Sequence, residues 1–173
     1  HSELAGVALT VAVQESDAAF FDHLLETFRR SDDALFRARA LAALGATHDP
    51  ELGRRALELA LDPSLRVNEV TTTISRQLGM EETRGRAWEW LREHFDQVFA
   101  RVASTRAGHA PWLAAGFCSG ERADEVRAFF EPRIEALPGG PRNLRGALEA
   151  IRLCTARVAA QRESAQAFFL RRR

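Results

Sequence analysis

Helix-capping residues recur at a regular spacing through the first half of the chain. Stretches of apolar residues with helical periodicity begin after Ser16 or Asp17, after Asp32 or Asp33, after Asp49 and after Asn68. Side-chain oxygens of this kind accept hydrogen bonds from the free N–H groups at a helix start. Alternate starts lie about 33 to 36 residues apart, a period typical of stacked helical hairpins. The spacing predicts an all-α fold, an irregular superhelix of antiparallel helix pairs of the HEAT or armadillo type, with a globular helix bundle as the alternative.

Apolar residues recur at steps of three and four along almost the whole chain, and no alternating strand pattern interrupts them. We expect helices over about 4–13, 17–28, 33–45, 50–61, 68–78, 81–104, 111–118, 121–137 and 142–170. The helix over 33–45 is expected to bury Leu35, Ala38, Leu41 and Ala42.

Two Asp-Pro pairs punctuate the middle of this pattern. Asp49 can cap a helix while Pro50 occupies its first position, where a missing N–H costs nothing. Asp62 and Pro63 end that helix, because the residue before a proline is driven out of the α region. A turn is therefore expected directly before the next helix.

Arg66, Asn68 and Glu69 follow that turn and are the candidate binding residues of the chain. An arginine at the start of a helix offers a fixed fork of donors to a carboxylate or a peptide carbonyl. The structural alternative is an ion pair between Arg66 and Glu69, or a helix cap by Asn68.

The charge balance excludes several classes of partner. Basic and acidic residues number 24 each, so the formal net charge is zero, and every basic residue is arginine. Neither nucleic acid nor a membrane is expected as a partner, because both are held by a basic surface. No apolar run reaches the roughly 18 residues that a membrane-spanning helix needs. We expect a soluble protein and favour the cytoplasm.

The side chains that carry catalytic chemistry elsewhere are isolated here. His-Glu-x-x-His is missing, and no histidine has a second one three or four residues away, so no metal site is expected in this chain. Gly116-Phe117-Cys118-Ser119-Gly120 has the spacing of a nucleophile elbow, but the residues before it favour helix rather than strand, which predicts a helix end. Cys118 and Cys154 are interpreted as small apolar core residues, with a bridge between them left open.

Four tracts carry a likeness to a known family. They are ALAALGATHDPELGRRALELALDPSLRVNE (40–69), TRGRAWEWLREHFDQVFAR (83–101), AGFCSGERADEVRAFFE (115–131) and ALEAIRLCTARVAAQRESAQAFFL (147–170). In order and spacing they resemble the C-terminal helical domain of the zinc aminopeptidases related to aminopeptidase N, puromycin-sensitive aminopeptidase and the endoplasmic-reticulum aminopeptidases.

The resemblance implies that residues 1–173 form one helical-repeat domain in the C-terminal part of a larger aminopeptidase. Such a domain is not catalytic: it covers the active site, shapes the substrate chamber and tunes the removal of N-terminal amino acids from peptides. The implied partners are the catalytic domain of the same polypeptide and the peptide substrate. The implied zinc belongs to the parent enzyme, and no cofactor is expected in this fragment.

In that setting Arg66, Asn68 and Glu69 would face the substrate chamber, together with Arg37 or Arg145. The family usually has Gln and Asp where Asn68 and Glu69 stand, which alters the reach of each side chain by one methylene. The alternative function is a stand-alone helical scaffold that binds a protein or peptide. A free-standing scaffold needs polar caps at both ends, so an exposed apolar surface on the first helix would favour the domain of a larger protein.

Overall fold

The computed structural model describes residues 2–135 and 137–171, and within them the chain folds into helices and turns without a strand. This architecture confirms the predicted all-α class. The chain forms two compact units, His1–Ala103 and Ser104–Arg173. Ala136, which the sequence places in the predicted helix over 121–137, lies outside the described residues. No described helix combines the length and the apolar character needed to cross a membrane.

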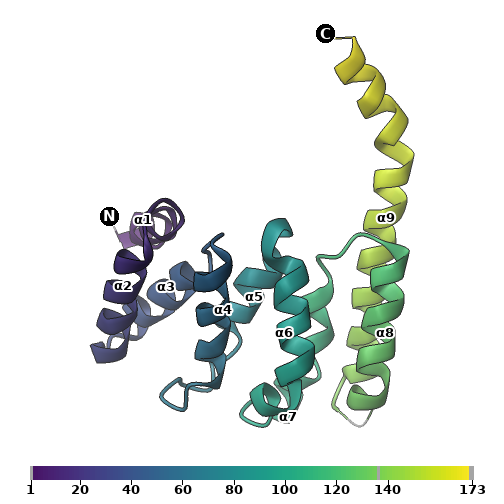
Figure 1. Ribbon diagram of the computed structural model, residues 1–173. Coiled ribbons are helices and arrows are strands. Elements are labelled where there is room, and N and C mark those ends of the chain that lie inside the picture. The colour runs from purple at the N-terminus through teal and green to yellow at the C-terminus, as the bar shows by residue number, and fades with distance from the viewer. Residues whose placement is uncertain (1, 136, 172–173) are drawn as a thin grey trace. The chain divides into compact units, whose positions relative to one another are not determined.

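The first unit is a series of helices that pack on their near neighbours in sequence (Figure 1). Its elements are α1 (Ser2–Glu15), α2 (Ala18–Arg30), α3 (Ala34–Leu44), α4 (Pro50–Glu58), the 3₁₀ turn η1 (Leu59–Leu61), α5 (Thr72–Gly79) and α6 (Glu81–Phe99). Helix α3 contacts α1, α2 and α5, while α4, α5 and α6 contact one another. Each of these helices thus packs mainly on helices that are near it in sequence.

Three helix starts in this unit, those of α2, α3 and α4, follow the predicted caps. The side chains of Asp17, Asp33 and Asp49 each accept hydrogen bonds from two backbone N–H groups in the first turn of α2, α3 and α4. Pro50 occupies the first turn of α4, as predicted. These starts were predictable because a cap involves only residues next to one another in sequence.

Helix α3 buries a different face from the predicted one. Its buried residues are Arg37, Ala40, Leu41, Ala43 and Leu44. Leu35 is 55% exposed, Ala38 is exposed and Ala42 is half-buried, so the prediction for these three residues is wrong. The face that turns inward carries Arg37, which an ion pair with Glu69 holds inside the unit.

The end of α3 and the start of α5 are set by contacts and turns rather than by a side-chain cap. Helix α3 ends at Gly45, where an added Cβ would lie 2.9 Å from the Cα of Thr73 in α5. This approach of backbone to backbone has room only for glycine. Helix α5 starts at Thr72 rather than at the predicted Asn68, because the residues before it are held in turns.

The second unit is built on a helical hairpin. Its elements are α7 (Ser104–Ala107), the 3₁₀ segment η2 (Ala110–Ala114), α8 (Gly120–Ile134) and α9 (Gly140–Leu170), with α8 and η2 both packed on α9. The predicted loop before α9 contains Gly139, whose φ of 73° is a left-handed conformation that favours glycine. Ser119 caps α8 by accepting a hydrogen bond from the N–H of Arg122.

Cys118 and Cys154 form a disulfide between the residues just before α8 and the middle of α9, with their Cα atoms 5.2 Å apart. Their interpretation as two separate core thiols is therefore wrong, and Cys118 has no free thiol to act as a nucleophile. The sequence left the bridge open because two cysteines 36 residues apart are brought together only by the α8–α9 hairpin.

Candidate functional site

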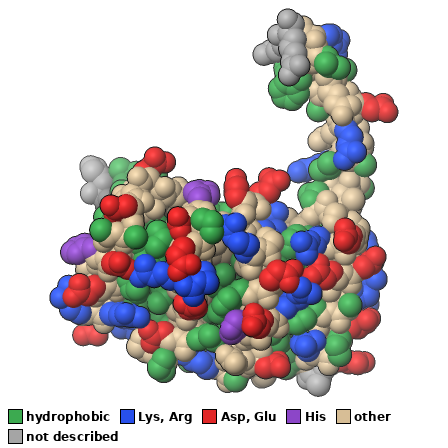
Figure 2. All heavy atoms as spheres, viewed as in Figure 1, with side chains coloured by type: hydrophobic (Ala, Val, Ile, Leu, Met, Phe, Trp, Pro, Cys, Tyr) green, Lys and Arg blue, Asp and Glu red, His purple; other side chains and the backbone are tan. Residues whose placement is uncertain are grey.

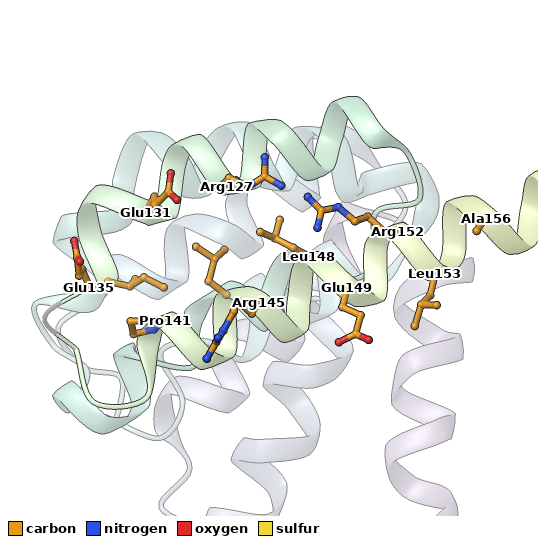
Figure 3. Close-up of a pocket in the computed structure, with 12 residues that line it drawn as sticks. Arg127, Glu131, Glu135, Pro141, Arg145, Leu148, Glu149, Arg152, Leu153 and Ala156 are labelled. Carbon is orange, nitrogen blue, oxygen red and sulfur yellow. The ribbon is translucent and has the colours of Figure 1, made fainter.

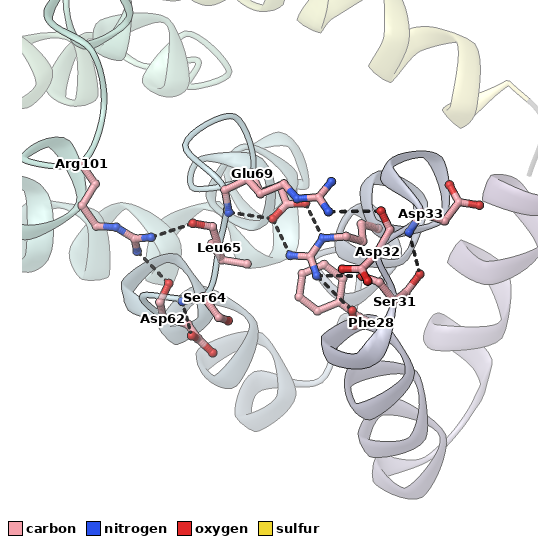
Figure 4. A network of polar contacts seen from close by, with 11 residues as sticks. Phe28, Ser31, Asp32, Asp33, Asp62, Ser64, Leu65, Glu69 and Arg101 are labelled. Carbon is pink, nitrogen blue, oxygen red and sulfur yellow. Dashed lines mark hydrogen bonds and ion pairs between the residues drawn. The ribbon is translucent and has the colours of Figure 1, made fainter.

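All three candidate residues lie in one segment of the first unit, residues 62–71, which connects η1 to α5 and contains turns but no helix. Figure 4 shows Arg101, from the residues after α6, beside Asp62 and Leu65 of this segment. Toward the other end of the segment, Glu69 is bound by Arg37 of α3. The polar contacts of these arginines decide which side chains of the segment point outward.

Arg37 holds the segment from inside the unit. Its Nε lies 2.8 Å from Oε1 of Glu69 and its Nη2 lies 2.7 Å from Oε2, a two-pronged ion pair. Nη1 donates to the carbonyl oxygens of Phe28 and Ser31, 3.2 Å from each, and the guanidinium carbon lies 4.2 Å from the centre of the Phe28 ring. Arg37 is 6% and Glu69 is 5% exposed, so the pair is buried and its hydrogen bonds replace those lost to water.

The environment of Glu69 favours its ionised form. The hydrogen bonds from Arg37 lower the pKa of Glu69, burial opposes them, and the backbone N–H of Arg66, 2.9 Å from Oε2, lowers the pKa further. The same bonds raise the pKa of Arg37. Glu69 therefore fixes Arg37 on one side and the backbone of Arg66 on the other.

Arg101 holds the beginning of the segment through carbonyl groups. Its Nη1 lies 2.8 Å from the carbonyl oxygen of Asp62 and 3.2 Å from that of Ala60, and its Nη2 lies 2.9 Å from that of Leu65. The Asp62 carboxylate accepts the N–H of Ser64 at 2.9 Å. The segment is thus fixed at both ends by guanidinium groups, from Arg37 of α3 and from Arg101 just after α6.

The three candidate residues separate into one buried and two exposed side chains. Glu69 is buried, with both carboxylate oxygens engaged by Arg37. Arg66 is exposed and donates from Nη2 to the carbonyl oxygen of Asp32 at 3.2 Å. Asn68 is exposed as well. The sequence suggested an ion pair between Glu69 and Arg66, but Glu69 pairs with Arg37 instead. Arg66 donates only its backbone N–H to Glu69.

Sequence reasoning named Arg37 only as a companion and missed Arg101. Both act through groups distant in sequence: 32 residues separate Arg37 from Glu69, and 39 separate Arg101 from Asp62. Among 24 arginines, no local pattern distinguishes the two that are used in this way. Arg145, the other suggested companion, lies on α9 in the second unit and is exposed.

The exposed surface of the segment is suited to binding rather than to bond cleavage. A guanidinium and an amide can hold the carbonyl or carboxylate groups of a peptide. Within the described residues, no group of three or more His, Cys, Asp or Glu side chains is placed to hold a metal ion. The described part of the chain therefore offers no ligand set for zinc.

The second unit has a groove of about 1130 Å³ between α8 and α9 (Figure 3). Arg127 of α8 and Arg152 of α9 point toward one another above Leu148, and Arg145 and Glu149 leave α9 on the side away from α8. Basic and acidic side chains alternate over the face of the molecule seen in Figure 2, in keeping with the zero net charge.

A family model and several known proteins are similar to this chain, and all of them concern aminopeptidases or a domain named after one. The family model described as "ERAP1-like C-terminal domain" matches residues 1–153. Aminopeptidase M1-B of Oryza sativa subsp. japonica is 28% identical over 151 residues, which are 85% of this chain and 17% of that protein. Aminopeptidase M1-A of the same organism is 26% identical over 150 residues, 86% of this chain and 17% of that protein. The chain thus spans about one sixth of the length of these relatives.

Proposed function

The chain belongs to the family of ERAP1-like C-terminal domains, and from this premise we propose that it is the non-catalytic helical domain of a zinc aminopeptidase. In the proposed parent the domain covers the active site, shapes the chamber that receives the peptide and tunes the removal of N-terminal amino acids. Its partners are the catalytic domain of the same polypeptide and the peptide substrate. Residues outside this chain hold the zinc.

The observation that carries the proposal is the fixed 62–71 segment with Arg66 and Asn68 on its outside. A surface that is already ordered loses little conformational entropy when it binds a flexible peptide. Arg66 makes one side-chain hydrogen bond, to the Asp32 carbonyl, and its guanidinium has further N–H donors for a ligand.

The proposal gives the three candidate residues different roles. Arg66 and Asn68 face the chamber and contact the peptide. Glu69 is a positioning residue, because its oxygens are occupied by Arg37 and by the backbone N–H of Arg66. Glu69 affects the peptide only indirectly, by fixing where Arg66 lies.

Helix α1 favours this proposal over a stand-alone scaffold. Leu4, Val7 and Val11 are 63%, 62% and 50% exposed, and they lie on one face of α1 at helical spacing. A repeat protein that meets water at this helix needs a polar outer face there. In the proposed parent another part of the polypeptide covers the three residues.

The first test is an activity assay on the 173-residue chain. We expect no release of nitroaniline from leucyl-nitroanilide, with or without added zinc, because the described residues lack a metal-ligand cluster. Zinc-dependent release that survives repurification would refute a non-catalytic domain.

The second test uses Arg66→Ala in the polypeptide that carries the domain. Loss of a charge-assisted hydrogen bond to the peptide is expected to raise KM for a long peptide about tenfold, and to leave KM for leucyl-nitroanilide unchanged. Arg76→Ala is the matched control, since Arg76 is an exposed arginine on α5. Equal effects of the two variants on KM for the long peptide, or an equal effect of Arg66→Ala on KM for the two substrates, would exclude Arg66 from the chamber.

A further inference from the structure

Helix α9 carries a heptad stripe along its whole length. The stripe consists of Leu144, Leu148, Ile151, Thr155, Val158, Arg162, Ala165 and Phe169, which follow one another at alternating steps of four and three residues. This spacing keeps side chains on the face of a helix that packs along another helix. The stripe therefore implies a helical partner over its full length.

The structure supplies a partner for only the first half of the stripe. Leu144, Leu148 and Ile151 are 6%, 5% and 0% exposed, on the part of α9 that packs against α8 and η2. Val158 and Phe169 are 47% and 68% exposed, and every described residue from 156 onward is exposed. The Cys118–Cys154 disulfide lies at this change and ties α9 to the start of α8. The second half of α9 is thus a helix anchored at one end, with an uncovered stripe.

The charge of this half is unlike that of the rest of the chain. Residues 154–173 contain five arginines and one glutamate, a formal charge of +4, whereas the whole chain is neutral, so residues 1–153 carry −4. Neither Arg157 nor Arg162 forms an ion pair with any described residue. Residues 154–173 also lie beyond the family match, which ends at residue 153.

We propose that the second half of the stripe, from Val158 to Phe169, is a docking surface for an acidic amphipathic helix of a partner polypeptide. Apolar side chains of that helix cover Val158, Ala165 and Phe169, and one of its carboxylates pairs with Arg162. The proposal is independent of the proposed function, since it uses no residue of the 62–71 segment.

Charge and register select this occupant. A second copy of the chain would bring together two segments of formal charge +4, which repel one another. A bilayer surface needs an unbroken apolar face, whereas Arg162 stands in the middle of this stripe. A helix with the same heptad register can place a carboxylate opposite that one position.

The test measures binding of two synthetic peptides to the 173-residue chain. Each peptide has about three heptads with leucine at the stripe positions, and the flanking positions are glutamate in one peptide and lysine in the other. By fluorescence anisotropy at low salt, we expect the glutamate peptide to bind at least about tenfold tighter than the lysine peptide. Raising the salt to about 0.5 M should weaken its binding, since salt screens exposed charges.

Three variants of the chain locate the surface. Phe169→Glu should weaken binding of the glutamate peptide about tenfold or more, and Arg162→Glu should remove the preference for that peptide over the lysine peptide. Ala160→Glu is the matched control, because Ala160 is exposed on the opposite side of α9 and binding should not change. Far-UV circular dichroism checks that each variant remains folded.

Several outcomes would overturn the proposal. Equal affinity for the two peptides, or no binding of either, excludes an acidic helix as the occupant. Concentration-dependent dimerisation in the ultracentrifuge that Phe169→Glu abolishes assigns the surface to a second copy. Binding to vesicles with about 30% anionic lipid, sensitive to Phe169→Glu and unaffected by the peptides, assigns it to a membrane.

Discussion

Arg37 and Glu69 are the residues on which the order of the 62–71 segment depends most. Each is almost fully buried, and the two form a direct ion pair with one another. An ion pair in such a place adds little net stability over an apolar pair, but removal of one member leaves the other charged and without compensation.

We expect Glu69→Ala to lower the free energy of unfolding of the first unit by about 3–5 kcal/mol, because Arg37 is then buried without a counter-charge. Urea denaturation followed by circular dichroism measures this loss. Glu51→Ala is the control, since Glu51 pairs with Arg54 in solvent and its removal should lower the free energy of unfolding far less. Similar losses in the two variants would contradict a structural role for the buried pair.

The depressed pKa of Glu69 predicts a particular dependence of stability on pH. The pKa of this carboxyl is lower in the folded chain than its ordinary value of 4.5, so its contribution is fully present above that value. The contribution is lost as the pH falls through the lower, folded pKa. Unfolding midpoints measured between pH 7 and pH 3 should therefore fall less in Glu69→Gln than in the natural chain. Parallel curves would exclude Glu69 as the titrating group.

The sequence suggested a local partner for Glu69 that the structure does not use. Arg66 and Glu69 are only three residues apart, so the sequence suggested an ion pair between these two neighbours. The pair that forms joins residues 32 positions apart, and it depends on how α3 lies against the turn. Local spacing contains no information on that packing.

Helix ends decide how closely the elements of the first unit approach. At Gly45 the end of α3 meets the backbone of α5, and an added methyl group would lie within 2.9 Å of the Thr73 Cα. Backbone atoms cannot move aside as the tip of a flexible side chain can, so the two helices would have to separate.

Gly45→Ala is expected to lower the free energy of unfolding by about 1–3 kcal/mol, the usual effect of overpacking. Gly85→Ala is the matched control, because a Cβ there meets nothing within 4 Å and alanine favours a helix interior by roughly 0.5–1 kcal/mol. Thermal unfolding of both variants gives the comparison. A Gly45→Ala variant as stable as the natural chain would show that α3 and α5 separate freely.

Sequence patterns gave the helices and their caps more accurately than the helix faces. Asp17, Asp33 and Asp49 act on the N–H groups next to them, so their roles are visible in sequence. The inward face of α3 depends on Arg37, whose buried position follows from a contact with another element. Leu35, also near the start of α3, is exposed.

The whole chain divides into two compact units, and the disulfide lies entirely within the second. A bridge that closes a loop of this length removes entropy from the unfolded chain, which is worth roughly 3–4 kcal/mol. The family match covers most of both units and confirms the resemblance that the sequence suggested. The division into units was not predicted, since the same helical periodicity continues through both.

Reduction of the disulfide should destabilise the second unit by about 3–4 kcal/mol and leave the first unit unchanged. Hydrogen exchange measured by mass spectrometry resolves the two: we expect faster exchange in α8 and in the buried half of α9, and no change in α6. The double variant Cys118→Ser/Cys154→Ser is the control, as it should exchange like the reduced chain whether or not reductant is present. A uniform increase over both units would contradict their independence.

The two arginines that hold the 62–71 segment do not respond alike to acid. Arg37 depends on a carboxylate, which loses its charge once its proton returns, whereas Arg101 is bound to carbonyl oxygens, which have no proton to gain at any ordinary pH. On acidification we expect the contacts made through carboxylates, Arg37–Glu69 and Arg29–Asp62, to weaken, while Arg101 keeps its hydrogen bonds to the carbonyl groups of Asp62 and Leu65. Acid is therefore expected to free the segment mainly at its Glu69 end, because only the Asp62 end is held by a guanidinium group that needs no carboxylate.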